Sequence, residues 1–212
     1  LISFLFILLC FFFVFPIKSN LLIIIIPFIL CSITISAIGL IDDLFNLSQK
    51  WRFSFHILVS LVSMTSIFIY SEKPFTFLNL ILIFLGAIWI IGNINVYNFM
   101  DGIDGIAAGC GIIFAINFAI FGILLNSTLI TLLSFALIPS LLGFLFLNLP
   151  PAKIFMGDVG ATFLGYTFSF IALLLAINKT ENILIGIIIL LPFLCDSGIT
   201  FLKRMINKEN IF

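Results

Sequence analysis

Long apolar runs separated by short polar stretches occupy most of this chain of 212 residues. A membrane-spanning helix needs about 20 mostly apolar residues, with a range of roughly 17–25. The pattern predicts eight helices, at residues 1–15, 20–41, 55–70, 77–92, 106–125, 129–147, 161–177 and 183–202. No repeat or low-complexity linker divides them, so we expect an all-α polytopic transmembrane helical bundle that forms a single domain over residues 1–212.

The composition supports a membrane protein. Only 8% of the residues are charged and 63% are hydrophobic, whereas roughly a quarter of the residues in a soluble domain are charged. The four cysteines lie singly in apolar runs without C-x-x-C spacing. We therefore interpret them as reduced apolar side chains and not as disulfide partners or metal ligands.

Acidic residues gather on one side of the predicted bundle. If the helices alternate in direction, the connections at 42–54, 93–105 and 148–160 share one face of the membrane. Five aspartates fall in these connections and a sixth approaches them from the last helix: Asp42, Asp43, Asp101, Asp104, Asp158 and Asp196. An unpaired carboxylate at mid-bilayer costs about 2.5–3.5 kcal/mol on insertion scales. This asymmetry predicts a functional site on that face.

The distribution of basic residues predicts which face this is. The aspartate side carries Lys50, Arg52, Lys153, Lys203, Arg204 and Lys208, and the opposite side carries Lys18, Lys73 and Lys179. Cytoplasmic loops are enriched in lysine and arginine. We therefore expect the aspartate face in the cytoplasm.

The first polar cluster is the adjacent pair Asp42 and Asp43, followed by Lys50 and Arg52. Neighbouring carboxylates repel each other, and a divalent cation or a bound cationic group relieves this repulsion. A solvated loop is the alternative for the aspartates. For the two basic residues, the alternative is an ordinary topology signal at a helix end.

The second cluster comprises Asn95, Asn98, Asp101 and Asp104, spaced by three residues. In a helix, neighbouring members of this series share a face and the whole set covers about half the circumference. This arrangement suits a ligand held by several oxygen atoms. Packing of small residues together with asparagine caps is the alternative, but it gives the two carboxylates no role.

The third cluster runs from Asn148 through Pro150 and Pro151 to Gly157 and Asp158. The two prolines end the preceding helix. Asp158 then stands at the N-terminus of the next helix, where it either caps that helix or holds Mg²⁺ beside an anion bound by the exposed amides.

Two further polar residues have ordinary structural alternatives. Asp196 precedes Lys203 by about two helical turns and forms an ion pair with it in the simplest interpretation. His56 is the only histidine, and an interfacial polar role is favoured for it.

The sequence contains no cluster of histidine and cysteine residues of the kind that binds zinc. The carboxylates, asparagines and glycines together favour Mg²⁺ and phosphate chemistry, in which catalysis is mostly positioning and charge neutralisation.

Four ordered segments carry a resemblance to a known family. They are GLIDDLFNLSQKWRF, NVYNFMDGIDGIAAG, PAKIFMGDVGATFLG and LPFLCDSGITFLKR, within residues 39–204. They resemble the polyprenyl-phosphate N-acetylhexosamine-1-phosphate transferases (glycosyltransferase family 4). The segment NVYNFMDGIDG resembles the corresponding motif of the enzymes that start O-antigen and surface-polysaccharide synthesis more than that of the peptidoglycan-precursor branch.

The resemblance implies a Mg²⁺-dependent enzyme that transfers a sugar-1-phosphate from a UDP-N-acetylhexosamine-type nucleotide sugar to undecaprenyl phosphate and releases UMP. It implies that Asp42 and Asp43 are the paired catalytic aspartates, Lys50 the phosphate-binding lysine and Asp158 the magnesium ligand. It implies that Asn98, Asp101 and Asp104 face the nucleotide and that Asn148 lies in the nucleotide pocket. Asn95, which shares the spacing by three residues, is also expected to bind substrate. Direct attack by the lipid phosphate and a covalent aspartyl-phosphate route both stay open.

Where the family has a glutamine six residues after the lysine, this chain has His56. We also expect the sequence to be a fragment that lacks segments at both ends. Expected partners are membrane lipid and the two substrates, with a homodimer left open and no nucleic acid.

The alternative function is an ion- or proton-coupled transporter that uses the aspartates as a relay. It is disfavoured because transporter carboxylates lie near mid-bilayer, whereas five of these six are predicted in connections.

Overall fold

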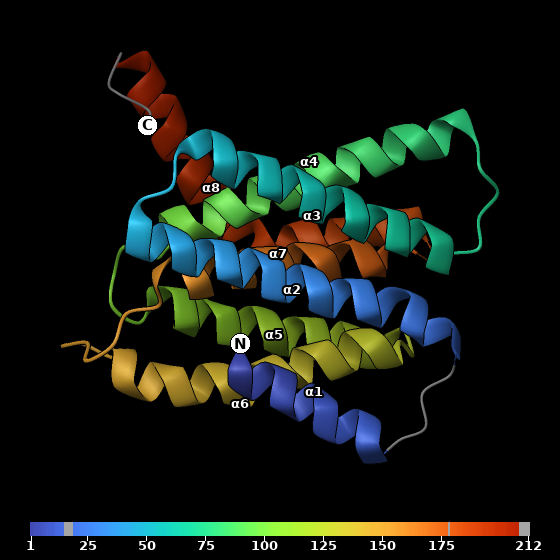
Figure 1. Ribbon diagram of the computed structural model, residues 1–212, viewed down its shortest axis with the longest axis horizontal. Helices are drawn as coiled ribbons and strands as arrows, with labels where there is room; N and C mark the ends of the chain where they lie inside the picture. Colours follow the sequence, from blue (N-terminus) through green and yellow to red (C-terminus); the bar gives the residue numbers. More distant parts are fainter. Residues whose placement is uncertain (15–18, 178, 208–212) are drawn as a thin grey trace.

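The chain folds as a bundle of roughly antiparallel α-helices (Figure 1). The computed structural model describes residues 1–14, 19–177 and 179–207. Within them lie eight α-helices and one short 3₁₀ helix. They are α1 (Ile2–Val14), α2 (Ser19–Phe45), α3 (Gln49–Tyr70), α4 (Phe77–Met100), α5 (Ile106–Leu124), α6 (Thr128–Asn148), α7 (Gly157–Leu175), η1 (Thr180–Asn182) and α8 (Ile183–Ile206). The predicted all-α fold with eight helices is confirmed for the described residues.

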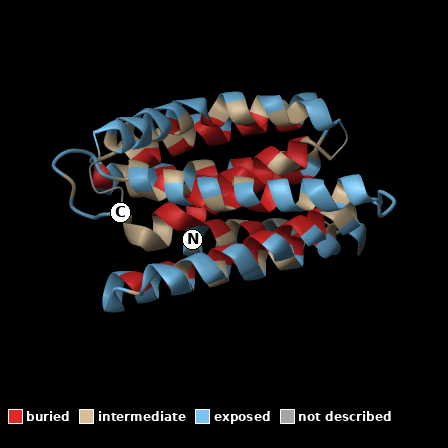
Figure 2. Cartoon of the chain, turned by 90° about the horizontal axis from the view of Figure 1, so that it is seen from above, coloured by how far each residue is buried: buried red, intermediate tan, exposed pale blue. Residues whose placement is uncertain are grey.

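Seven of these helices, α2 to α8, are long and apolar enough to cross a membrane. Their outer faces carry large exposed apolar side chains such as Phe84, Ile113 and Phe146, a composition that suits contact with lipid tails. The protein is therefore a multi-pass membrane protein. Exposed residues follow the outer helices, and buried residues concentrate between them (Figure 2).

Helix α7 lies at the centre of the bundle. Of its most apolar 18-residue stretch, 78% is buried, against 28% for α4. It packs against α2 and α4 most extensively and also against α5, α6 and α8. Tyr166 of α7 is fully buried, and its hydroxyl lies 2.8 Å from the Ser63 hydroxyl of α3, which satisfies both polar groups. These contacts with the neighbouring helices fix the position of α7 and of its first turn, which carries Asp158.

The connections alternate between the two ends of the bundle. Those of α2 to α3, α4 to α5 and α6 to α7 share one end, and those of α3 to α4, α5 to α6 and α7 to α8 share the other (Figure 1). This is the predicted division. Lys18 and Lys208, both used in the predicted orientation, lie outside the described residues.

Five predicted helix ends at the aspartate face are wrong in the same direction. Helix α2 continues to Phe45 instead of 41, α3 begins at Gln49 instead of 55, α4 continues to Met100 instead of 92, α7 begins at Gly157 instead of 161, and α8 continues to Ile206 instead of 202. Hydropathy detects only the apolar part of a helix, whereas its backbone hydrogen bonds continue through polar residues beyond it.

The helix extensions change the setting of the aspartates. Asp42, Asp43 and Asp158 lie within helical turns, and only Asp101 and Asp104 of the predicted five lie in a connection. The expectation that five aspartates fall in connections is therefore wrong. All five remain at the same end of the bundle, because the helices that carry them end there.

Candidate active site

Two adjoining cavities open at the aspartate end of the bundle. The first has a volume of ≈ 200 Å³, and its lining from α2, α3, α4 and α7 includes Asp42, Arg52, His56, Asn95, Asn98 and Asp158. The second has a volume of ≈ 230 Å³ and is lined by residues that include Asn98, Asp101, Asp104, Asn148 and Asp158. Asn98 and Asp158 border both. The two cavities thus bring together polar residues that are far apart in the sequence.

Two glycines allow α2 and α7 to meet beside the first cavity. A Cβ atom at Gly39 would lie 2.7 Å from the backbone carbon and oxygen of Asp158, so only glycine permits this approach. Gly157 has a φ of +61°, and a Cβ there would lie 2.7 Å from Oδ2 of Asp43. These contacts place the last turn of α2 against the first turn of α7.

Asp43 uses this proximity to cap α7. Its Oδ1 accepts a hydrogen bond from the backbone N–H of Asp158 at 3.2 Å. The N-terminal amides of a helix have no partner within the helix, and a carboxylate there also interacts favourably with the helix dipole. The cap of α7 therefore comes from another helix. Asp158 is thus the capped residue, and the predicted alternative that its own side chain caps the helix is not what the structure shows.

Arg52 joins the two carboxylates that face the first cavity. Its Nη1 donates to Oδ2 of Asp42 and lies 3.3 Å from Oδ2 of Asp158. Asp42 is buried, with 8% of its side chain exposed, and the exposed fractions of Asp158 and Arg52 are 25% and 34%. Two carboxylates this close repel each other unless a positive charge lies between them. Here the guanidinium group occupies that position.

Asn95 and Asn98 lie on the last two turns of α4, as the helical reading of their spacing predicts. Both line the first cavity. The Nδ2 of Asn95 donates to the carbonyl of Ile91 at 2.7 Å, one turn earlier in the same helix. This bond fixes the amide and leaves its oxygen as the group available to a ligand.

The second cavity lies between the α4–α5 and α6–α7 connections, which hydrogen bonds tie together. Oδ2 of Asp104 accepts from the backbone N–H of Ala152 at 3.1 Å. Asn148 is buried; its Oδ1 accepts from the N–H of Gly105 at 2.9 Å, and its Nδ2 donates to the carbonyl of Ile154 at 2.8 Å. The side chain of Asn148 thus makes backbone contacts that shape the cavity.

Asp101 lies just beyond α4 with its carboxyl partly buried beside the second cavity. Burial, together with the negative charge of Asp158, raises the pKa of the Asp101 carboxyl to about 6. Four aspartates and one arginine line the two cavities, so their lining carries more negative than positive charge. A cation or a positively charged group at this position would be bound favourably.

Two of the polar residues singled out in the sequence, Lys50 and Asp196, lie elsewhere. Lys50 is exposed in the first turn of α3 and lines neither cavity. Asp196 is exposed on α8, also away from both. Among the described residues Asp196 and Lys203 do not form an ion pair, so that interpretation is wrong.

Two residues to which the sequence analysis gave no role in the site line the first cavity. Arg52, read as a topology signal, is its cationic residue, and His56, read as interfacial, is buried in its wall. Arg52 and His56 are four residues apart and therefore share one face of a helix. This spacing would have placed them together if α3 had been predicted to begin before residue 55.

The chemistry of the cavity fits Mg²⁺ in one of its usual binding modes. In the part of the chain that the structure describes, no group of three or more His, Cys, Asp or Glu side chains encloses a metal site. Mg²⁺ in phosphate-transfer sites is commonly held by one or two carboxylates together with substrate phosphates, and not by an all-protein cage. The carboxylates of Asp42 and Asp158, which already share one positive group, supply such a pair.

Comparison with known proteins places these features in a family. The model of glycosyl transferase family 4 matches residues 24–176. A Bacillus subtilis (strain 168) protein named as a probable undecaprenyl-phosphate N-acetylglucosaminyl 1-phosphate transferase is 36% identical over 185 residues, which are 84% of this chain and 52% of that protein. A phospho-N-acetylmuramoyl-pentapeptide-transferase of Staphylococcus epidermidis is 34% identical over 145 residues, 68% of this chain and 44% of that protein. The chain spans about half the length of these curated relatives.

Proposed function

Because the chain belongs to glycosyl transferase family 4, we propose that the protein transfers a sugar-1-phosphate from a UDP-sugar to undecaprenyl phosphate and releases UMP. The relatives named above act on undecaprenyl phosphate or transfer a phospho-sugar. The observation that carries the proposal is that Asp42 and Asp158 meet at Arg52 at one end of a membrane bundle, beside two adjoining cavities that Asn98 also lines, while Asp43 bonds the Asp158 amide.

The site has room for the two ends of a nucleotide sugar. In this proposal the first cavity receives the phosphates and the second, which the pair of connections encloses, receives another part of the donor. Asn98 and Asp158 border both cavities and therefore lie where the pyrophosphate passes from one to the other. The donor is proposed to be of the UDP-N-acetylhexosamine type, and the product starts a cell-surface glycan.

Asp158 would hold Mg²⁺, with Asp42 beside it. When bound, this cation would supply charge neutralisation at the donor pyrophosphate. Asp43 keeps the first turn of α7 in place through its bond to the Asp158 amide. Arg52 can leave its carboxylate partners and pair with a phosphate oxygen, since its planar guanidinium suits both kinds of anion.

The acceptor phosphate is the nucleophile in this proposal. One of its oxygens forms a bond to the sugar-linked phosphorus, the bond to the bridging oxygen breaks, and UMP leaves with that oxygen. A phosphate monoester has a second pKa near 6, so it is largely dianionic at pH 7 and needs little help from a base. Lys50, on a flexible stem at the same end of the bundle, is proposed to attract this phosphate.

The orientation of the protein in the membrane is part of the same proposal. The aspartate end would face the cytoplasm, where UDP-sugars are made available, and the membrane would be the bacterial inner membrane. The predicted excess of lysine and arginine at that end supports this orientation.

The test is release of UMP by the intact protein in bilayers with undecaprenyl phosphate, a panel of UDP-sugars, and Mg²⁺ present or absent. We expect release only with Mg²⁺ and acceptor, and a loss of about 10²-fold or more for Asp158→Asn and Asp42→Asn. Asp196→Asn is the control, because Asp196 is exposed on α8 and lines neither cavity. Near-normal turnover of both cavity variants would refute the assignment, and rapid UMP release without acceptor would favour the covalent route.

A further inference from the structure

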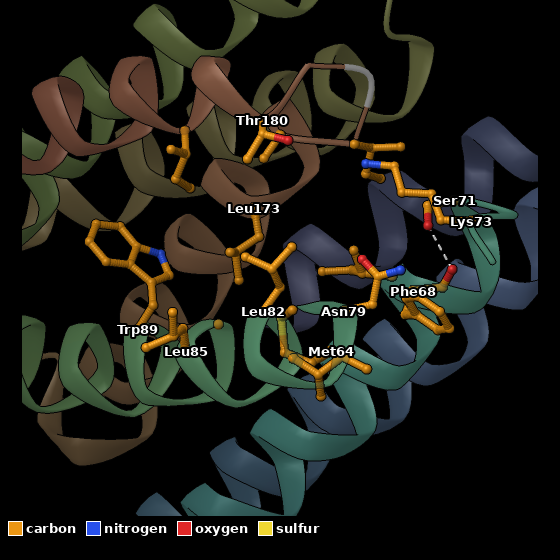
Figure 3. Close-up of a pocket in the computed structure, with 16 residues that line it drawn as sticks. Met64, Phe68, Ser71, Lys73, Asn79, Leu82, Leu85, Trp89, Leu173 and Thr180 are labelled. Atoms are coloured by element: carbon orange, nitrogen blue, oxygen red, sulfur yellow. Dashed lines mark hydrogen bonds between the residues drawn. The ribbon is translucent and has the colours of Figure 1, made fainter. Parts of the chain in front are cut away.

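A separate cavity lies at the opposite end of the bundle from the aspartates, between α3, α4, the end of α7 and the start of α8 (Figure 3). Its volume is ≈ 240 Å³, and it shares no lining residue with the two cavities described above. The inner wall is apolar and includes Met64, Leu82, Trp89 and Leu173. A molecule bound in this cavity would therefore contact none of the residues that line the two cavities at the aspartate end.

The cavity opens toward the lipid on the side of α4. Leu82 and Leu85 of α4 are 40% and 53% exposed on the outside of the bundle, within a helix that is apolar enough to cross the membrane. An apolar void has no contact partners on one side, so its lining loses dispersion energy unless something fills it. The nearest apolar molecules in a bilayer are acyl chains.

The mouth of the cavity is polar. Ser71, Lys73, Asn79 and Thr180 lie where α3 ends, α4 begins and α7 connects to α8 (Figure 3). These helix ends mark the level at which the chain leaves the apolar layer. A cavity with an apolar interior and a polar mouth at this level matches the two parts of a phospholipid.

Lys73 gives the mouth a positive charge that no described residue neutralises. The side chain forms neither an ion pair nor a hydrogen bond with any residue that the structure describes. The adjacent Glu72 does not line the cavity, and its Oε1 accepts from Nδ2 of Asn20 on α2 at 3.4 Å, which draws the carboxylate toward another helix. A headgroup at the mouth would therefore meet a cation.

We propose that this cavity binds an anionic phospholipid of the leaflet opposite the aspartate face, with an acyl chain against Trp89 and Leu173 and the phosphate against Lys73. The cation selects the headgroup by charge, because a lysine near the membrane surface attracts anionic lipid. The apolar wall accepts the chain of any phospholipid. The two parts of the site can therefore be tested separately.

Trp89 is a reporter built into the wall. Its Nε1 donates to the carbonyl of Ser169 at 3.3 Å, which fixes the ring at the cavity. The experiment uses the intact protein in vesicles of phosphatidylcholine, with Trp51 and any tryptophan outside these 212 residues replaced by Phe, so that Trp89 is the only tryptophan. Phosphatidylglycerol or phosphatidylcholine with brominated acyl chains is then added at equal mole fractions, and bromine quenches Trp89 fluorescence on contact.

We expect the brominated phosphatidylglycerol to quench Trp89 at roughly fivefold lower mole fraction than the brominated phosphatidylcholine, as one lysine at a membrane surface provides. Lys73→Gln should remove this difference. Lys179→Gln is the matched control: Lys179 is exposed at the same end but does not line the cavity, so the difference should persist. Ala176→Phe, which fills the mouth side of the wall, should reduce quenching by both lipids.

Three outcomes would overturn the proposal. Equal quenching by the two lipids would show that no charge selection exists, and equal effects of Lys73→Gln and Lys179→Gln would assign the selection to general surface charge. Displacement of the brominated phospholipid by undecaprenyl phosphate would assign the cavity to the polyprenyl carrier. Lys73 lies in an exposed connection, so its substitution leaves the helix packing intact even if Ala176→Phe disturbs it.

Discussion

The Oδ1 atom of Asp43 accepts a hydrogen bond from the backbone N–H of Asp158, 115 residues later in the chain. This bond ties the end of one spanning helix to the beginning of another. The two adjacent aspartates of α2 therefore have different partners. Asp42 turns toward Arg52 and the first cavity, while Asp43 turns toward the amide of Asp158. The two carboxylates have different neighbours and, we infer, different tasks.

Replacement of Gly157 should disturb this contact. In Gly157→Ala the new Cβ would lie 2.7 Å from Oδ2 of Asp43, and the φ of +61° is unfavourable for alanine by about 1–2 kcal/mol. We expect a lower thermal unfolding temperature and slower UMP release. Gly143→Ala is the control, because nothing lies within 4 Å of a Cβ placed at Gly143. Equal unfolding temperatures for the two variants would contradict the close contact.

Replacement of Arg52 should separate catalysis from cation binding. Arg52→Gln removes the positive group between Asp42 and Asp158, so their negative charge becomes more available to a metal ion. We expect the Mg²⁺ concentration for half-maximal activity to fall, while maximal UMP release falls by about 10²-fold if the guanidinium also binds phosphate. Both quantities come from one Mg²⁺ titration.

Lys153→Gln provides the comparison for Arg52, since Lys153 is exposed at the same end of the bundle and lines neither cavity. It should leave the Mg²⁺ titration unchanged. A higher Mg²⁺ requirement in Arg52→Gln would mean that the two carboxylates do not bind the cation together.

The helical bundle was predictable because each spanning helix carries its own signal in the sequence. Eight apolar runs gave eight helices, and their alternation correctly placed Asp42, Asp101 and Asp158 at one end. The polar helix ends were not predictable in this way. A turn such as the one that contains Asp42 is held by backbone hydrogen bonds that hydropathy does not register.

The partners of individual side chains also required the three-dimensional structure. The spacing of Asn95 and Asn98 predicted a common helical face, and both line one cavity. Arg52 was ambiguous, because basic residues are common at the ends of spanning helices whether or not they contact an aspartate. Its role depends on the approach of α2 and α7 at Gly39, a contact between segments 119 residues apart.

Asp101 should make the stability of the protein depend on pH. The pKa of its carboxyl is raised to about 6 in the folded protein, from an ordinary value of 3.8. The folded state therefore binds this proton more tightly than the unfolded state. Stability should fall as the pH rises from about 3.8 through 6 and then level off. Unfolding temperatures measured across this range without Mg²⁺ report the slope.

Asp101→Asn should remove this contribution and give a flatter profile, with a higher unfolding temperature at neutral pH than the native protein. Asp196→Asn should keep the native slope, because Asp196 is exposed outside both cavities. Identical profiles for Asp101→Asn and the native protein would assign the pH dependence to other groups.

Asn148 should be needed for the shape of the second cavity. It is 4% exposed, and its side chain bonds the backbone N–H of Gly105 and the backbone carbonyl of Ile154. In Asn148→Ala both backbone groups lose their partner, at a cost of about 1–3 kcal/mol for each buried group. We expect faster amide hydrogen exchange at Gly105, a lower unfolding temperature and a raised KM for the UDP-sugar.

Asn148→Asp keeps the acceptor for the N–H of Gly105 but not the donor for the carbonyl of Ile154, so only the first of these bonds should survive. Asn117→Ala is the matched control, since Asn117 bonds only within its own helix, to the carbonyl of Ile113. A KM that changes equally in Asn148→Ala and Asn117→Ala would show that the bonds of Asn148 do not shape the donor site.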